Sequence, residues 1–317
     1  MGSEDYEKAL RSLNFALAIK KDHFYGWLLK GNCQFALGRY EDALRSLNRA
    51  LALNDANFQA WYSKGLLLSE LGKQREAIYS LDRALRLKKN DFNLWYLRGY
   101  GLIELKEYQK AIASLKRAVA LNPADPDAWY YLAFSQSCLG RNREALLAYD
   151  QAIKNDPGNI DLICYQGLAL CELGRFKEAE RLFERVLEKD PEHILALVNL
   201  SERYLVSGKL TKGIRAAKKA LKAKDSEFKI ISGYLVLTGY FLEGKNQKAL
   251  AELRILMEFI KGLGDQAKVT DWNFSPLVDV IKKNLSQPSR KIVLSLIGML
   301  RGKLKLNSFE KLIRDLD

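Results

Sequence analysis

Apolar residues recur at intervals of three and four along most of the chain, which is the spacing of one face of an α-helix. These stripes are short, and turns such as Leu37-Gly38-Arg39 and Leu71-Gly72-Lys73 separate them. Glycine adopts the left-handed backbone conformation that ends many helices. The pattern therefore predicts short helices joined in antiparallel pairs as far as about residue 262.

The helix pairs repeat with a period of 34 residues. Large apolar residues recur at this interval in the series Trp27, Trp61, Trp95, Trp129, Ile163, Leu197 and Ile231. A small residue such as Gly31 or Gly65 follows four positions later, and the second helix carries small residues on both sides of a bulky one, as in Ala43, Leu47 and Ala50. A single hairpin cannot cover its own apolar face, so we expect successive hairpins to stack.

These motifs, W-x-x-x-G in the first helix, A-x-x-x-[LFY]-x-x-A in the second and a proline at 123, 157 and 191, resemble the tetratricopeptide repeat. The resemblance implies an all-α fold, a right-handed superhelical solenoid of stacked antiparallel helix hairpins with a C-terminal helical cap. It covers residues 5–225 well and residues 228–260 poorly. The tyrosine usual in the first helix is absent from most units and returns only at Tyr204.

The period divides the chain into four parts. We expect a partial first repeat with only its second helix, six full units, a degenerate hairpin and a set of capping helices, at residues 1–23, 24–227, 228–262 and 263–317. Ser275-Pro276 and Pro288 are typical helix starts within the last part. An independent binding element is the alternative interpretation of these C-terminal helices.

The first repeat is incomplete because only five residues precede Tyr6, the first residue to match a second helix. Met1-Gly2-Ser3 also resembles an expression scar, so we expect the chain to be a fragment of a longer repeat array. The uncovered apolar face of this helix would then allow a homodimer to form through the truncated N-terminal end.

In tetratricopeptide arrays, the first helices line a concave groove in which a peptide or helix of a partner protein binds. The resemblance places on the wall of this groove Tyr25, Leu28, Asn32, Tyr62, Leu66, Asn93, Tyr96, Tyr100, Tyr130 and Phe134. Aromatic side chains provide a large contact area at a low cost in rotamer entropy. Glutamates at 70, 104 and 172 recur along one edge, so we expect an amphipathic helix or peptide with some basic residues. The alternative is that some tyrosines pack between repeats.

The net charge of +13 is concentrated in the last third of the chain. From Lys209 onward there are 22 basic and 11 acidic residues, whereas the preceding 208 residues carry a net charge of only +2. One predicted helix carries a basic patch formed by Lys212, Arg215, Lys218, Lys219 and Lys222. Such a patch would bind nucleic acid or an acidic partner, which is the alternative function, although a solvated helix face is the simpler interpretation.

Nothing in the sequence indicates an enzyme. There are two histidines and no C-x-x-C pair, so we expect no metal site, and no phosphate-binding loop or nucleophile elbow indicates a cofactor or a catalytic centre. No apolar stretch approaches the roughly 18 residues of a membrane span. No secretory signal is visible, so we expect a cytoplasmic protein with reduced thiols.

Overall fold

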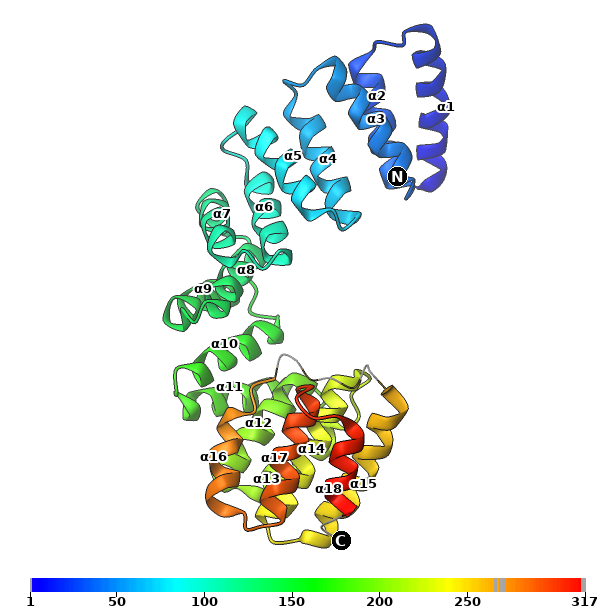
Figure 1. Cartoon of the computed structure of the whole chain (residues 1–317). Helices are drawn as coiled ribbons and strands as arrows, with labels where there is room; N and C mark the ends of the chain where they lie inside the picture. Colours follow the sequence, from blue (N-terminus) through cyan, green and yellow to red (C-terminus); the bar gives the residue numbers. More distant parts are fainter. Residues whose placement is uncertain (1, 265–266, 268, 270–271, 315–317) are drawn as a thin grey trace. The chain divides into compact units, whose positions relative to one another are not determined.

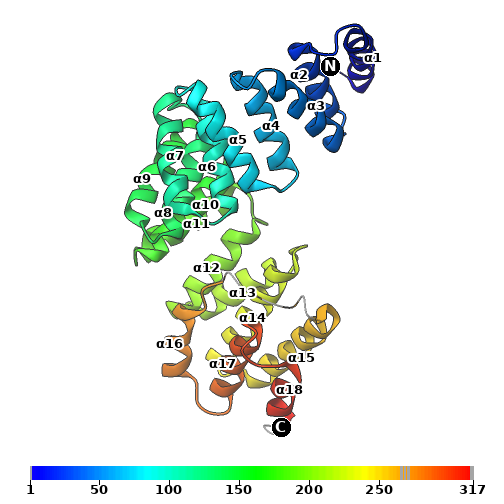
Figure 2. The same cartoon turned by 45° about the horizontal axis from the view of Figure 1, so that its top comes forward.

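The computed structural model describes residues 2–264, 267, 269 and 272–314 (Figures 1 and 2). Every regular element in these residues is a helix, as the resemblance implies. The chain divides into two compact units, Met1–Leu162 and Ile163–Asp317, which we call unit 1 and unit 2. None of the described helices is both long enough and apolar enough to cross a membrane.

Unit 1 is built from helix hairpins that pack in chain order. Its helices are α1 (Ser3–Ile19), α2 (Phe24–Ala36), α3 (Tyr40–Leu53), α4 (Phe58–Glu70), α5 (Gln74–Leu87), α6 (Phe92–Glu104), α7 (Tyr108–Leu121), α8 (Pro126–Cys138), α9 (Asn142–Asn155) and the beginning of α10 (Ile160–Glu172). The first helices of the hairpins, α2, α4, α6 and α8, contact one another, and each also packs against its own second helix. The first helices therefore form one side of the stack.

The repeated tryptophans fix the start of each first helix. The indole nitrogens of Trp27, Trp61, Trp95 and Trp129 each donate to the main-chain carbonyl of the residue six positions earlier, at 2.7–2.8 Å. Side chains at the N-cap add a second anchor, and Asp125 Oδ1 accepts from the amide of Ala128 at 2.8 Å. The 34-residue period thus marks a hydrogen-bonded turn as well as a packing position.

The small residue of the W-x-x-x-G motif is required by the close approach of the two helices. A Cβ atom added at Gly31 would lie 2.8 Å from Leu47 Cγ, and one at Gly99 would lie 2.6 Å from Leu115 Cγ, closer than a real side chain allows. The glycines of the turns have a different role, because they have positive φ angles. Lys106 stands at the same place in its unit and also has a positive φ, of 59°.

Unit 2 continues the hairpins and then adds three helices. It contains the end of α10, then α11 (Phe176–Lys189), α12 (Ile194–Val206), α13 (Leu210–Ala220), α14 (Ser226–Leu242), α15 (Asn246–Leu263), α16 (Ser275–Asn284), α17 (Ser289–Leu300) and α18 (Leu306–Arg314). Helix α16 packs on α12 and α14, and α17 packs on α14, α16 and α18 (Figure 1). The added helices thus lie on the first helices α12 and α14, on the side that is equivalent to the predicted groove.

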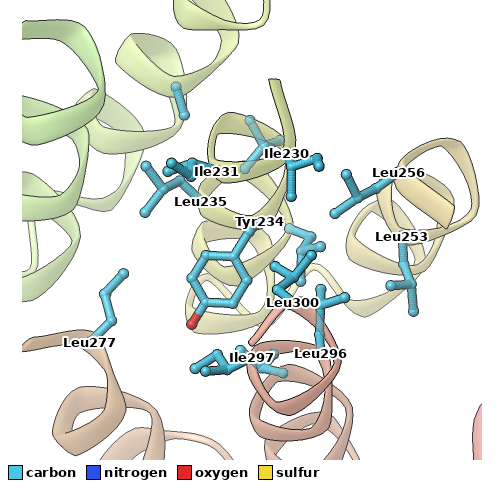
Figure 3. Close-up of a cluster of buried hydrophobic side chains, with 14 of the residues drawn as sticks. Ile230, Ile231, Tyr234, Leu235, Leu253, Leu256, Leu277, Leu296, Ile297 and Leu300 are labelled. Atoms are coloured by element: carbon cyan, nitrogen blue, oxygen red, sulfur yellow. The ribbon is translucent and has the colours of Figure 1, made fainter. Parts of the chain in front are cut away.

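The core of unit 2 lies between α14, α15 and the added helices. Figure 3 shows Tyr234 pointing from α14 toward Ile297 on α17, with Leu277 of α16 nearby. The rings of Tyr234 and Phe274 meet edge to face with their centroids 5.0 Å apart, and both side chains are fully buried. The first-helix side of unit 2 is therefore a packed interior rather than a surface.

Candidate binding surfaces

The largest aromatic surface of unit 1 is formed by side chains of α6 and α8. Tyr131 joins the two helices, because its ring centroid lies 5.9 Å from that of Tyr96 and 5.3 Å from that of Tyr100. Tyr130 stacks beside it at 5.0 Å and also contacts Phe134 at 6.3 Å. We call these five residues the aromatic cluster. All five are partly exposed, so the cluster is open to solvent while its members support one another.

The other predicted groove residues lie outside this cluster. Tyr25 is 57% exposed, and its ring contacts Phe24. Asn93 is exposed, and Asn32, Tyr62 and Leu66 are partly exposed. Leu28 is only 4% exposed and belongs to the apolar core around α2 and α3, so the structure places it in the interior and not on an open wall.

Tyr131 was missed in the sequence because it lies one position beyond the residues assigned to the groove wall. Other units place a leucine or a serine at this position, as at Leu29, Ser63 and Leu97. The tyrosine is therefore not a repeat feature, and only the neighbouring tyrosines of α6 could have indicated its role.

Carboxylates surround the aromatic cluster. Burial raises the pKa of Tyr96, and the neighbouring Tyr131 and then the carboxylates of Asp127 and Asp125 raise it further. The pKa of Tyr100 is raised by burial and then by Glu104. These shifts have a common cause, because negative charge and partial burial both disfavour a phenolate.

The carboxylates also act on one another. Burial raises the pKa of Asp127, and the nearby Asp125 and Asp156 raise it further. Glu70 and Glu104, the predicted acidic edge, are both exposed. The surface around the cluster therefore has a negative potential that favours a cationic ligand.

A basic surface lies between α13 and α15 in unit 2. It surrounds a hollow of about 460 Å³, which is lined by Arg215, Lys218, Lys219 and Lys222 of the predicted patch and also by Lys245 and Lys248 of α15. Tyr240 of α14 lines it too, and the Lys218 ammonium lies 5.2 Å from the centroid of its ring. The sequence pattern missed the α15 lysines because they are more than 20 residues from the helix that carries the patch.

Part of this basic charge is already paired. Lys218 Nζ lies 3.5 Å from a Glu252 oxygen, and Lys222 Nζ lies 2.6 Å from one of Glu192. Lys212 lies outside the hollow, with its ammonium 5.8 Å from the centroid of the Tyr204 ring. The hollow nevertheless contains several lysines against a single lining carboxylate, Glu243.

The two histidines cap helices. Nδ1 of His23 accepts from the Gly26 amide at 2.9 Å, and Nδ1 of His193 accepts from the Ala196 amide at 3.2 Å. Within the part of the chain that the structure describes, no group of three or more His, Cys, Asp or Glu side chains is placed to hold a metal ion. The histidines thus have a structural role at the start of α2 and α12.

Stacked helix hairpins with a conserved 34-residue register are the structure of a helical repeat protein. Family models described as tetratricopeptide repeat match residues 1–51, 28–92, 126–159 and 161–193, and a further model described as TPR repeat matches residues 99–137. The chain belongs to the tetratricopeptide repeat family. No curated protein sequence matches it.

Solved structures support the same assignment. The chain is 25% identical to YrrB, described as a TPR protein with an unusual peptide-binding site, over 58% of this chain and 95% of YrrB, with a TM-score of 0.55. It is 25% identical to MamA (41-end) from Desulfovibrio magneticus RS-1, over 54% of this chain and 96% of that one, with a TM-score of 0.51. A TPR repeat-containing protein from Cytophaga hutchinsonii, at 16% identity over 69% of this chain and 91% of that one and with a TM-score of 0.60, shares the fold.

The repeats and these relatives support a protein-interaction scaffold, and tetratricopeptide repeat proteins are generally non-catalytic.

Proposed function

We propose that unit 1 binds a peptide or helix of a partner protein on the aromatic cluster, and that this segment carries basic side chains. The observation that carries the proposal is the contact of Tyr96 and Tyr100 with Tyr131 across two repeats, in side chains that stay partly exposed. Rings held by their neighbours lose little entropy when a partner binds, which is typical of binding hot spots. The peptide-binding site named in the description of YrrB supports a ligand of this class.

The charge around the cluster supports a basic segment. Asp125, Asp127 and Asp156 lie close enough together to raise the pKa of Asp127, and a cationic side chain placed among them would relieve this repulsion. Complementary charge also increases the rate at which partners associate, so binding is expected to weaken as the salt concentration rises.

The test is capture of partners by the immobilised chain in the presence of nuclease. The double variant Tyr96→Ala/Tyr131→Ala removes two contacting rings of the cluster. Tyr79→Ala is the matched control, because Tyr79 is a tyrosine of the second helix α5 and is 57% exposed. Loss of about 2 kcal/mol or more of binding free energy in the double variant alone is expected. Equal capture by all three proteins would contradict the proposal.

A second candidate function is binding of nucleic acid or an acidic partner on the basic surface of unit 2. It is favoured by the convergence of Lys219, Lys245 and Lys248 with Tyr240 on one hollow. An oligonucleotide that binds there should lose affinity steeply with salt, and Lys219→Gln/Lys248→Gln should make the salt dependence shallower by about two counterions. An unchanged slope would eliminate this surface as the binding site.

A further inference from the structure

Unit 2 contains a cavity of about 480 Å³ on its first-helix side. Its walls come from the end of α10, from α12 and α14, and from the segment that leads into α16. Aromatic and apolar side chains provide most of the lining, including Leu168, Phe176, Phe228 and Trp272. This volume is within the range of cavities that bind small molecules or single side chains.

Glu202 lines this cavity and has one carboxylate oxygen without a partner. The residue is only 6% exposed, and its Oε2 accepts from Arg203 Nη2 at 3.1 Å. Its Oε1 is buried and has no hydrogen-bond partner among the described residues. A buried charged oxygen without a donor is costly, so it requires an explanation.

Arg203 does not provide the missing donor. Its guanidinium is buried beside Glu202, and its central carbon lies 4.7 Å from the centroid of the Phe176 ring, an arrangement that stabilises the cation by its contact with the ring. Arg203 is also the single cationic side chain in the lining, against the three carboxylates of Glu172, Glu202 and Glu227. The cavity therefore has an excess of negative charge.

The lining also contains an unused donor. The indole nitrogen of Trp272 is buried and finds no acceptor among the described residues. A ligand that satisfies both groups would present a cation to Glu202 and a carbonyl oxygen to Trp272. The aromatic rings of Phe176 and Phe228 would contact the aliphatic chain between them.

The position of Glu202 in the repeat explains how the cavity arises. Counting in steps of 34 residues, Glu202 stands at the place of Leu66, Tyr100 and Phe134, on the predicted wall of the groove. In unit 2 this wall is covered by α16, which packs on α12 and α14. A position that is open on α6 and α8 is thereby enclosed.

We propose that this cavity binds an alkylammonium or alkylguanidinium group, with the cation at Oε1 of Glu202 and the alkyl chain between Phe176 and Phe228. The site is separate from the aromatic cluster and does not depend on the function proposed for unit 1. A lysine or arginine side chain of a peptide and a free amine share this chemistry. The carbonyl acceptor for Trp272 distinguishes the two sources.

Calorimetric titration of the whole chain tests the site. The peptide probes are the Nα-acetyl methylamides of arginine and lysine, the free amines are agmatine and spermidine, and the neutral control is the norleucine methylamide. At least one cation is expected to bind with a Kd between about 10 µM and 1 mM, at least about tenfold more tightly than norleucine. Tighter binding of the amino-acid amides indicates a peptide source, and tighter binding of agmatine or spermidine indicates a free amine.

The variants place the cation. Glu202→Gln keeps the shape of the side chain and should weaken binding by about tenfold or more. Glu258→Gln, which removes the same charge from an exposed position on α15, should leave binding unchanged. If no cation binds, or if Glu202→Gln binds as tightly as the original protein, the proposal is overturned.

Two further measurements remain informative if Glu202→Gln does not fold. Leu168→Trp fills the cavity without changing its charge and should abolish binding. Cys171 also lines the cavity, and burial raises the pKa of its thiol to about 11, so a bound cation should slow its alkylation. Cys138, which is exposed on α8, is the internal reference. Binding that survives Leu168→Trp, or alkylation of Cys171 that is unaffected at saturating ligand, would also refute the proposal.

Discussion

The first helices of the two units share one repeat register but have different surroundings. In unit 1, Tyr100 and Phe134 of α6 and α8 are partly exposed members of the aromatic cluster. In unit 2, the equivalent residues Glu202 and Val236 are buried, because α16 and α17 pack on α12 and α14. The comparison teaches that the repeat period determines where a side chain points, and that what packs on it afterwards determines whether it is available to a partner.

The covering helices bind to unit 2 through apolar burial. Leu277, Ile281 and Leu296 are all completely buried, and each such side chain contributes about 1.5–3 kcal/mol relative to an exposed one. A partner would have to displace these contacts to reach the first helices of unit 2. We therefore assign partner binding to the open surface of unit 1.

A matched pair of phenylalanines should show the largest difference between the units. Phe274→Ala removes a fully buried ring that contacts Tyr234 and should lower the free energy of unfolding of unit 2 by about 3–5 kcal/mol. Phe134→Ala removes a partly exposed ring and should cost about 1 kcal/mol. Urea unfolding monitored by circular dichroism measures both, and equal losses would contradict the comparison.

The ionisation of Glu202 should give unit 2 its own pH dependence. Burial raises its pKa to about 7 although Arg203 opposes the shift; the other charged or titratable groups coupled to it are Glu172 of α10 and Tyr234 of α14. A carboxyl whose pKa is raised on folding stabilises the fold while it is protonated, and this contribution is lost as pH rises from about 4.5 through 7.

The expected result is a loss of roughly 2 kcal/mol in the unfolding free energy of unit 2 between pH 5 and pH 8. The Glu202→Gln variant should not show this loss, because glutamine does not ionise in this range. Chemical denaturation at several pH values measures the difference between the two proteins. Parallel pH profiles would show that Glu202 is ionised with an ordinary pKa.

Helix caps should have the smallest effects and should act similarly in both units. Asp125→Ala removes the acceptor of one amide at the start of α8, and Asp225→Ala removes the acceptor of two amides at the start of α14. Each substitution is expected to cost about 1 kcal/mol, somewhat more at Asp225. Thermal unfolding measures both, and a cost at Asp125 far above that at Asp225 would indicate a further role for Asp125 in unit 1.

The repeating part of the fold could be predicted because its causes are local. The tryptophans, the small residues and the turn glycines each act within one hairpin, so a 34-residue period reveals them. The prediction extended to α15, where the period ends. The domain boundaries drawn from it stay a prediction.

The covered surface of unit 2 could not be predicted because its contacts are not local. Leu277 of α16 lies more than 70 residues from α12 in the sequence, and no repeat links the two. The same reason hid the cavity at Glu202, although the register already placed that residue on the groove wall. Tyr131 was missed for a different reason, since it occupies a position that other repeats fill with leucine or serine.

The most direct test of the open and covered surfaces is cysteine labelling at equivalent positions. Phe134→Cys and Val236→Cys occupy the same place in their repeats, on α8 and α14. Peptide-level mass spectrometry distinguishes each new thiol from the four native ones. The account predicts rapid alkylation at position 134 and, at position 236, labelling only when unit 2 unfolds. Equal rates at both positions under native conditions would contradict it.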